Sequence, residues 1–259
     1  MQPWNIAHRG GAQLMPENTL AAFADALARG CDGAELDVQL TRDGVVVVHH
    51  DFRLKADLTR KGGGWLTGAG PRIKDLAFEE LQHFDVGTAR PGSDYAWSHP
   101  LLKPLEACVP SLEDVVVMAD RGFKLFVELK CDTSEDSADP IALADAVYEI
   151  CAGRDNLIFV GFDWRALARL KRRAPGAECW FTTEKLWGDA RPVIEGFAEA
   201  GGEGWFPHLA DATPDNIAHA RTCGLEVGAW TVNAPADMRR LLALDAICTD
   251  RPDLLAQLL

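Results

Sequence analysis

Short apolar segments alternate with helix-length segments from residue 124 to the C-terminus, and this alternation restricts the fold more than any other feature of the chain. It predicts parallel strands joined by helices, because a crossover between parallel strands needs a dozen or more residues. The segments read KLFVEL, NLIFVGF, AECWFTT, GEGWFPH, LEVGAWTV and DAICTD, with WNIAH and GAELDV nearer the N-terminus. Eight strand–helix units in 259 residues match the size of an α/β protein of the (β/α)8 TIM-barrel class. A doubly wound open sheet is the main structural alternative.

Helix-start and helix-stop signals lie between the expected strands. The segment ENTLAAFADALARG has apolar residues at the spacing of one helical face and ends at Gly30, and we expect Pro16 and Glu17 to begin this helix. The segment SLEDVVVMADRG begins at Ser111 with a capping-box pattern in which Asp replaces the usual Glu or Gln, and it ends at Gly122. Both segments fit the helices that a barrel needs between its strands.

A hairpin follows the second expected strand. The segment GAELDVQL passes through TRDG directly into VVVVHHD, and a connection this short can join only antiparallel strands. If the first of these strands belongs to the barrel, the return strand brings His49, His50 and Asp51 close to Glu35 and Asp37. The hairpin therefore predicts that histidines and carboxylates meet at one end of the barrel.

Residues 52–109 fit no strand–helix unit. They are rich in Gly, Pro and Trp, with one helical stretch around IKDLAFEELQHF. A long insertion of this kind at the active face of a barrel is typical of a cap or a specificity loop. We therefore expect a single domain over residues 1–259, with the insertion at about 52–109 capping the active-site face.

The charge balance argues against nucleic-acid and membrane partners. The chain has 26 Lys and Arg against 39 Asp and Glu, a formal net charge of −13, so its surface should repel polyanions and anionic membranes. It contains no apolar run long enough to span a bilayer, and its N-terminus becomes polar before a signal sequence could form. We expect no nucleic-acid binding, no stable membrane association and no secretion.

The cysteines indicate the compartment. There are seven, widely spread and without a CxxC pair. This pattern favours buried free thiols over a disulfide framework or a zinc site. We therefore expect a cytoplasmic protein.

Polar residues interrupt the first three parallel strands near their C-terminal ends, where barrel enzymes build their active sites. Three carboxylates that converge there would repel one another without a cation, and oxygen ligands favour Mg2+ or Ca2+. With the two basic residues, such a site would carry one net positive charge, which suits a phosphodiester. The residues concerned are His8, Arg9, Glu35, Asp37, Glu128 and Lys130.

Two histidines could complete a reaction at this site. One imidazole could take a proton from the attacking oxygen while another gives a proton to the leaving oxygen. His8 supplies one of them, and alternation along a strand sends His49 and His50 to opposite faces, so only one of these two can serve. Gly10 and Gly11 would let the backbone approach a ligand closely.

These residues carry a resemblance to a known family. The sequence resembles glycerophosphodiester phosphodiesterases in HRGG at 8–11, PENT at 16–19, ELDVQLTRDG at 35–44, HHD at 49–51, VELK at 127–130, WTVN at 230–233 and TDRP at 249–252. The resemblance implies a barrel enzyme that uses a divalent metal to hydrolyse small glycerophosphodiesters to glycerol 3-phosphate and an alcohol. It assigns acid–base catalysis to His8 and His50, metal binding to Glu35, Asp37 and Glu128, and substrate binding to Arg9, Lys130 and Trp230.

Other interpretations of single residues remain open from the sequence. Glu128 and Lys130 could form a structural salt bridge, His49 could act in place of His50, and Trp230 could be only core or pocket wall. His208, after the sixth expected strand, is a weaker site candidate. The segment GFD at 161–163 matches the family's usual SFD only in part.

Two further functions compete with the first. A lysophospholipase D or a sphingomyelinase-D-like hydrolase would use the same barrel but would need an apolar groove or a membrane-facing patch. A catalytically silent binding barrel would need none of the polar residues described above. The sequence leaves open the head-group preference, the physiological metal, the oligomeric state, the roles of the two histidines as acid and base, and the choice between direct attack by water and a cyclic phosphate intermediate.

Overall fold

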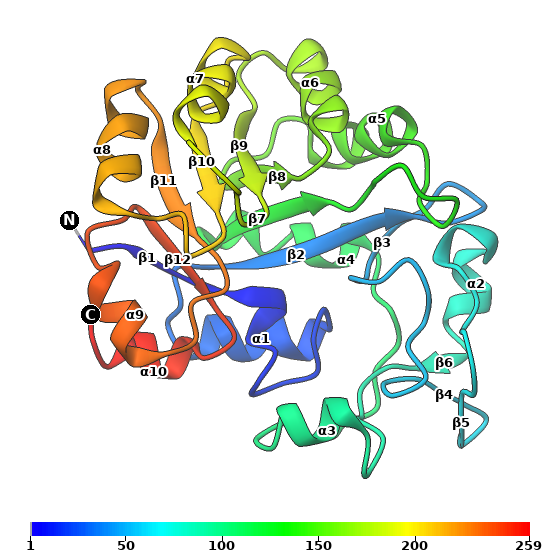
Figure 1. The fold of residues 1–259 in the computed structure, drawn as a ribbon. Helices are drawn as coiled ribbons and strands as arrows, with labels where there is room; N and C mark the ends of the chain where they lie inside the picture. Colours follow the sequence, from blue (N-terminus) through cyan, green and yellow to red (C-terminus); the bar gives the residue numbers. More distant parts are fainter. Residues whose placement is uncertain (1) are drawn as a thin grey trace.

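Eight parallel strands close into a barrel in the computed structural model, which describes residues 2–259 (Figure 1). The strands follow one another around the barrel in chain order, and β1 pairs with both the second and the last of them. This closure confirms the (β/α)8 barrel and excludes the open sheet. The strands are β1 (Trp4–Ala7), β2 (Gly33–Leu40), β7 (Lys124–Leu129), β8 (Leu157–Gly161), β9 (Glu178–Thr183), β10 (Gly204–Pro207), β11 (Glu226–Ala229) and β12 (Ala246–Thr249).

Helices surround the strands, as Figure 1 shows. The capping box at Ser111 is present, and a short 3-10 helix, η3 (Ala119–Arg121), ends at Gly122 in the left-handed conformation. The first helix begins later than predicted, because Thr19 caps it by accepting a hydrogen bond from the backbone of Ala22. The helices around the barrel are α1 (Leu20–Ala28), α4 (Leu112–Val116), α5 (Pro140–Cys151), α6 (Trp164–Arg173), α7 (Arg191–Glu199), α8 (Pro214–Thr222), α9 (Pro235–Arg240) and α10 (Pro252–Ala256).

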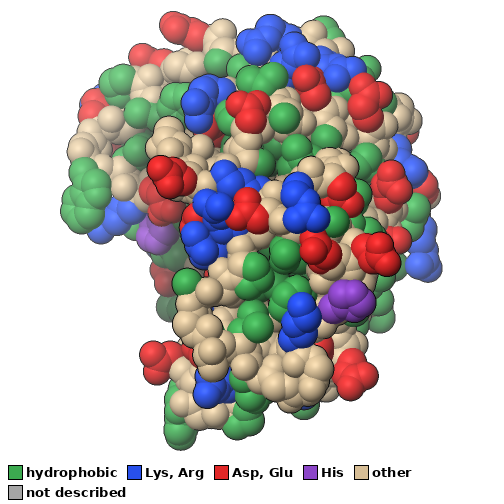
Figure 2. Space-filling view, turned by 90° about the vertical axis from the view of Figure 1, so that its right-hand side faces the viewer, with side chains coloured by type: hydrophobic (Ala, Val, Ile, Leu, Met, Phe, Trp, Pro, Cys, Tyr) green, Lys and Arg blue, Asp and Glu red, His purple; other side chains and the backbone are tan. Residues whose placement is uncertain are grey.

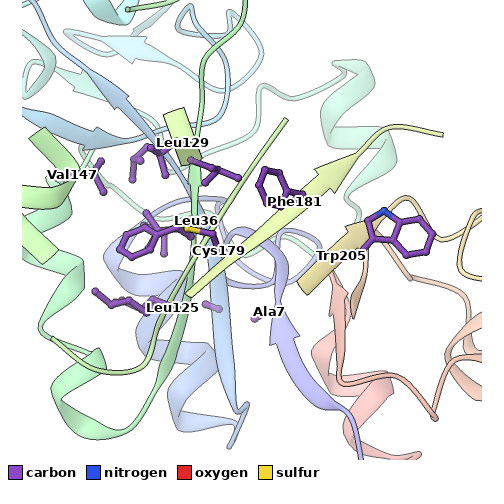
Figure 3. Close-up of a cluster of buried hydrophobic side chains, with 14 of the residues drawn as sticks. Ala7, Leu36, Leu125, Leu129, Val147, Cys179, Phe181 and Trp205 are labelled. Carbon is purple, nitrogen blue, oxygen red and sulfur yellow. The ribbon is translucent and has the colours of Figure 1, made fainter. Parts of the chain in front are cut away.

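Alternation along the strands creates two apolar cores. Side chains that point outward pack against the helices, and Leu36, Leu125 and Phe181 belong to this layer (Figure 3). Their neighbours point inward and fill the barrel, where Phe126 and Trp180 meet edge to face with ring centroids 5.3 Å apart. Trp180 fits only because β10 begins with a glycine: a Cβ at residue 204 would lie 2.3 Å from the indole. The packed interior leaves room for a site only at the ends of the barrel.

The predicted hairpin is present. Strand β3 (Val46–Val48) runs antiparallel to β2, with Val48 opposite Val38. The chain then enters the insertion, which has an apolar cluster of its own around Leu54, Ile73 and Leu81. The predicted helical stretch forms η2 (Ile73–Asp75) and α2 (Phe78–Leu81); the other elements of the insertion are β4 (Arg60–Lys61), β5 (Gly64–Trp65), β6 (Phe84–Asp85) and α3 (Asp94–Ser98).

The hairpin and the insertion occupy the right-hand and lower parts of Figure 1. Figure 2 views the molecule from that side and shows acidic and basic side chains interspersed, so the negative charge of the chain is not gathered into one patch on this face. Within residues 2–259, no helix has both the length and the apolar character needed to cross a membrane.

Candidate active site

A pocket of about 70 Å³ opens at the C-terminal ends of the barrel strands. Seven of the eight site residues predicted from the sequence line it, and the eighth, Asp37, is buried beside them with a carboxylate oxygen 3.6 Å from Lys130 Nζ. The tertiary structure therefore brings the whole predicted set together. The lining residues are His8, Arg9, Glu35, His50, Glu128, Lys130, Phe162, Thr182, Glu184, Phe206, Trp230 and Cys248.

Three buried carboxylates form the floor of this site. Glu35 and Asp37 lie on β2, Glu128 lies opposite Asp37 on β7, and one oxygen from each lies within 4.8 Å of the others. Glu35 Oε1 is buried and has no hydrogen-bond partner. Burial, together with the charges of Asp37 and Glu128, raises the pKa of Glu35 well above its ordinary value. Such a group gains much from a cation between the three carboxylates.

Asp37 has the opposite electrostatic character. Burial alone would raise the pKa of Asp37, but the positive charges of His50, Arg9 and Lys130 more than offset it and hold that pKa below its ordinary range. Asn18 Nδ2 also donates a hydrogen bond to Asp37 Oδ2 over 2.8 Å. The burial of His50 lowers its pKa to about 4, so at neutral pH the charges of Arg9 and Lys130 act on Asp37. Asp37 is therefore ionised and ready to bind a cation.

The salt bridge between Lys130 and Glu128 is present. Lys130 Nζ lies 2.8 Å from Glu128 Oε1. Burial lowers the pKa of Lys130, whereas the charges of Glu128 and Asp37 raise it by more, so the amine stays protonated. The pair shares the pocket wall, and the ammonium group remains available to an anionic ligand there.

His8 stands where β1 ends, in the 3-10 helix η1 (His8–Gly10). Its Nδ1 lies 2.6 Å from Asp250 Oδ1, and its Nε2 lies 3.8 Å from Glu35 Oε2. Asp250 is held in turn by Asn233 Nδ2, which donates a hydrogen bond to its other oxygen over 2.7 Å. A carboxylate that fixes one ring nitrogen leaves the other free to exchange protons in the pocket.

His50 is held in the same way as His8. Its Nδ1 lies 2.6 Å from Asp51 Oδ1, and the ring lines the pocket. His49 does not line the pocket: its ring is buried away from it, its Nε2 has no hydrogen-bond partner, and burial lowers its pKa to about 4. Gln39 fixes this segment by donating to the backbone carbonyls of His49, at 2.7 Å, and Asp51, at 2.8 Å.

Arg9 is held in an unusual backbone conformation, with φ of 51°. Its guanidinium group contacts Glu17 Oε1 at 3.2 Å and Asp37 Oδ2 at 3.4 Å. Packing also requires the glycine after it: a Cβ on Gly10 would lie 2.6 Å from the Cβ of Ala22 on α1.

Trp230 is half-buried in the pocket wall. Its ring meets Phe162 edge to face at 5.3 Å, and its Nε1 donates to the backbone carbonyl of Phe206 over 3.1 Å. It also packs against the barrel core, so this residue is part of both the core and the pocket wall. His208 packs edge-on against the indole at 5.7 Å and does not line the pocket.

Comparisons with known proteins identify the family of this chain. The model of the glycerophosphoryl diester phosphodiesterase family matches residues 8–254. The chain belongs to this family. A glycerophosphodiester phosphodiesterase from Caldanaerobacter subterraneus is 29% identical, with 98% of this chain and 96% of that protein covered. An uncharacterized protein from Bacillus subtilis is 33% identical, with 98% and 97% covered.

Solved structures agree with this assignment. One from Silicibacter pomeroyi, assigned to the glycerophosphoryl diester phosphodiesterases, has a TM-score of 0.88 at 33% identity and covers 98% of this chain and 92% of that one. A phosphodiesterase from Oleispira antarctica, solved with sn-glycerol-3-phosphate, shares the fold with a TM-score of 0.78 at 24% identity, with 99% and 96% covered. The chain is therefore a phosphoric diester hydrolase of the glycerophosphodiester phosphodiesterase class.

In this phosphodiesterase, sequence reasoning missed most of the residues that hold the site side chains in place; of these, it placed only Asp51 beside the site. All of them fall within motifs that carried the family resemblance, so the motifs were a usable signal, but only the fold shows what each residue contacts. These supporting residues are Glu17, Asn18, Gln39, Asp51, Asn233 and Asp250.

Proposed function

We propose that this phosphodiesterase hydrolyses small deacylated glycerophosphodiesters to glycerol 3-phosphate and an alcohol, with a divalent cation and with His8 and His50 as the acid–base pair. One observation carries the proposal. Three buried carboxylates, one with an unpartnered oxygen, lie at the same pocket as two histidines whose Nδ1 atoms are each held by a carboxylate at 2.6 Å.

The donor set fits a hard cation. Glu35, Asp37 and Glu128 offer oxygen ligands within 4.8 Å of one another, and no cysteine is among them. The unpartnered Glu35 Oε1 is an atom that a cation would satisfy. These three residues would hold Mg2+ or Ca2+, which would supply positive charge to stabilise the phosphoryl oxygens as the reaction proceeds.

The chain's own residues then have separate tasks. Arg9 and Lys130 bind the anionic phosphoryl group, because both are protonated and lie at the pocket. His8 and His50 exchange protons through their free nitrogens, one with the attacking oxygen and one with the leaving oxygen. Asp250 and Asp51 fix the rings so that these nitrogens face the pocket.

The pocket favours a small substrate. With a volume of about 70 Å³ it has no room for an acyl chain, which would extend outside it. Trp230 and Phe162 form an aromatic wall on which the carbon atoms of a glycerol or alcohol group can pack. The insertion is the element that we propose as the cap of this face.

The seven cysteines support a reducing compartment for the enzyme. All seven are free thiols in the structure, and five of them are buried. We therefore keep a cytoplasmic location as part of the proposal.

The test is hydrolysis of glycerophosphocholine by enzyme dialysed against chelator, before and after addition of Mg2+ or Ca2+. Release of glycerol 3-phosphate that depends on added metal supports the proposal, and lysophosphatidylcholine serves as the competing substrate. Full turnover in excess chelator would contradict the metal assignment, whereas turnover of the lysolipid in place of the deacylated diester would contradict the substrate class.

A further inference from the structure

The insertion reaches the active site through two side chains to which the proposed mechanism assigns no role. Tyr95 on α3 and Lys55, just after the hairpin, are separated by 40 residues in sequence but lie together, with Lys55 Nζ 5.9 Å from the centre of the Tyr95 ring. Neither residue lines the pocket. Each contacts a carboxylate that holds a predicted site residue.

The first contact runs from Tyr95 to Arg9 through one carboxylate. The Tyr95 hydroxyl donates to Glu17 Oε2 over 2.7 Å, and the other oxygen of Glu17 accepts from Arg9 over 3.2 Å. The Glu17 side chain is only 9% exposed, so both interactions take place largely out of solvent. A hydrogen bond to a buried carboxylate is stronger than one at the surface, and it restricts the positions that the carboxylate can adopt.

The second contact runs from Lys55 to His50 in the same manner. Lys55 Nζ lies 2.8 Å from Asp51 Oδ2, and the other oxygen of Asp51 lies 2.6 Å from His50 Nδ1. Each carboxylate thus uses one oxygen for the site residue and the other for the insertion. The insertion orients both side chains without touching the pocket.

We propose that the insertion is a positioning element of the active site: Tyr95 orients Arg9 through Glu17, and Lys55 orients His50 through Asp51. This inference rests on the proposed function for its kinetic form, because it takes Arg9 as a phosphate-binding residue and His50 as an acid–base residue. A mere cover would exclude solvent from the site. A positioning element also fixes two different groups and therefore affects two different steps.

The two contacts predict different kinetic effects. Tyr95→Phe removes the hydroxyl and loosens Arg9, so KM for glycerophosphocholine should rise by roughly threefold to thirtyfold with kcat nearly unchanged. Lys55→Met removes the charge that holds Asp51, so kcat should fall by roughly threefold to thirtyfold with KM nearly unchanged. Lys55→Arg keeps the charge and should restore most of kcat.

Matched controls separate these effects from loss of a hydroxyl or a charge in general. The chain has two tyrosines, and Tyr148→Phe changes the second, on α5 at the opposite end of the barrel. Lys103→Met removes an exposed lysine from the same insertion. Both controls should retain wild-type kcat and KM.

The outcomes are distinct. The split between KM for Tyr95→Phe and kcat for Lys55→Met supports the inference. Values of kcat and KM for both variants that match their controls overturn it. A fall in kcat and a rise in KM of similar size in both variants, together with a lower melting temperature, also overturn it, because they indicate structural support alone.

A second readout does not depend on turnover. Side-chain ¹⁵N relaxation of Arg9 Nε should show greater mobility in Tyr95→Phe than in the wild type and in Tyr148→Phe. If the wild-type enzyme fails to hydrolyse any glycerophosphodiester, the proposed function fails, and this measurement still decides the inference: unchanged Arg9 mobility overturns it.

Discussion

The two ends of the barrel differ in a way that cavity size does not reveal. A pocket of about 410 Å³ opens at the N-terminal end, whereas the pocket that the site residues line at the C-terminal end measures about 70 Å³. The larger pocket lies where β8 and β9 begin, and Arg173 in its wall forms an ion pair with Asp145, which like Arg173 is partly exposed on a helix. The smaller pocket holds buried carboxylates that share two positively charged side chains, Arg9 and Lys130. Confined charge, and not volume, distinguishes the end that can do chemistry.

The largest effect should follow from loss of the carboxylate cluster. Glu35→Gln should reduce activity by more than roughly 10³-fold, with loss of metal affinity, because it removes a ligand while relieving a repulsion that raises the pKa of Glu35. The melting temperature of the metal-free protein should stay the same or rise. Glu178→Gln, at the other end of the barrel, should leave activity unchanged.

Calorimetric metal titration and thermal unfolding check this prediction. Similar variants, Asp37→Ala and Glu128→Ala, should also lose metal affinity. A sharp fall in the metal-free melting temperature of all three variants would indicate that the carboxylates serve as structural ion pairs.

The next effect concerns neighbouring histidines with different surroundings. His8→Ala and His50→Ala should each lower kcat by roughly 10²- to 10⁴-fold with little change in metal binding, whereas His49→Ala should affect mainly stability, because its ring is buried away from the pocket. A p-nitrophenol leaving group needs no proton donor, so it should rescue the variant that lacks the acid and not the one that lacks the base. Equal inactivity of His49→Ala and His50→Ala would contradict the placement.

Strand β12 offers a comparison within one element. Asp250 follows its C-terminal end and holds His8, while Asp245 precedes its N-terminal end and accepts a hydrogen bond from the backbone of Val227 over 2.8 Å. Asp250→Asn should lower kcat by roughly 10- to 10³-fold, because an amide no longer favours the same imidazole tautomer. Asp245→Asn should keep wild-type kcat. Steady-state kinetics decide the matter, and equal effects of the two substitutions would remove the distinction between the ends.

The smallest effect compares a buried ion pair with an exposed one through the pH dependence of the free energy of unfolding. Burial raises the pKa of Glu17, but Arg9, Lys55 and the Tyr95 hydroxyl lower it by more, to about 2 from an ordinary 4.5. Because the folded pKa lies below the unfolded one, the ionised Glu17 stabilises the fold above about pH 4.5. This stabilisation is lost as the pH falls toward 2.

Urea unfolding of Glu17→Gln measures this difference. The variant should be less stable than the wild type by roughly 1–3 kcal/mol at pH 7, and the gap should narrow below pH 4.5 and close near pH 2. Glu149→Gln, which breaks an exposed pair with Arg173, should show no measurable change at either pH. A gap for Glu17→Gln that is as large at pH 2 as at pH 7 would show that its charge is not the cause.

Agreement between sequence and structure is greatest where local pattern decides. The eight strands, the antiparallel return of β3 and the capping box at Ser111 all follow from short-range rules of alternation, turn length and hydrogen bonding. The predicted start of the first helix was wrong, because the local sequence around Pro16 and Glu17 is compatible with a helix start. Asn18 instead takes a positive φ, and its side chain bonds to Asp37 on β2.

The site shows the same division. Its charged residues could be found from sequence because polar side chains at the ends of apolar strands are conspicuous. Their partners could not, because contacts such as His8 with Asp250 join residues 242 apart. The choice between His49 and His50 likewise depends on which face of a short segment meets the pocket.

The barrel and the residue types at its catalytic end can be predicted from sequence, because strand periodicity and crossover length are local properties that hold wherever the segment lies. Which carboxylate is held ionised, which ring nitrogen is fixed and how the insertion reaches Arg9 and His50 follow from the fold alone. These outcomes depend on burial and on distances of a few ångströms between segments far apart in the chain. Electrostatic energy at such distances changes steeply with position, and position is set by the packing of the whole barrel.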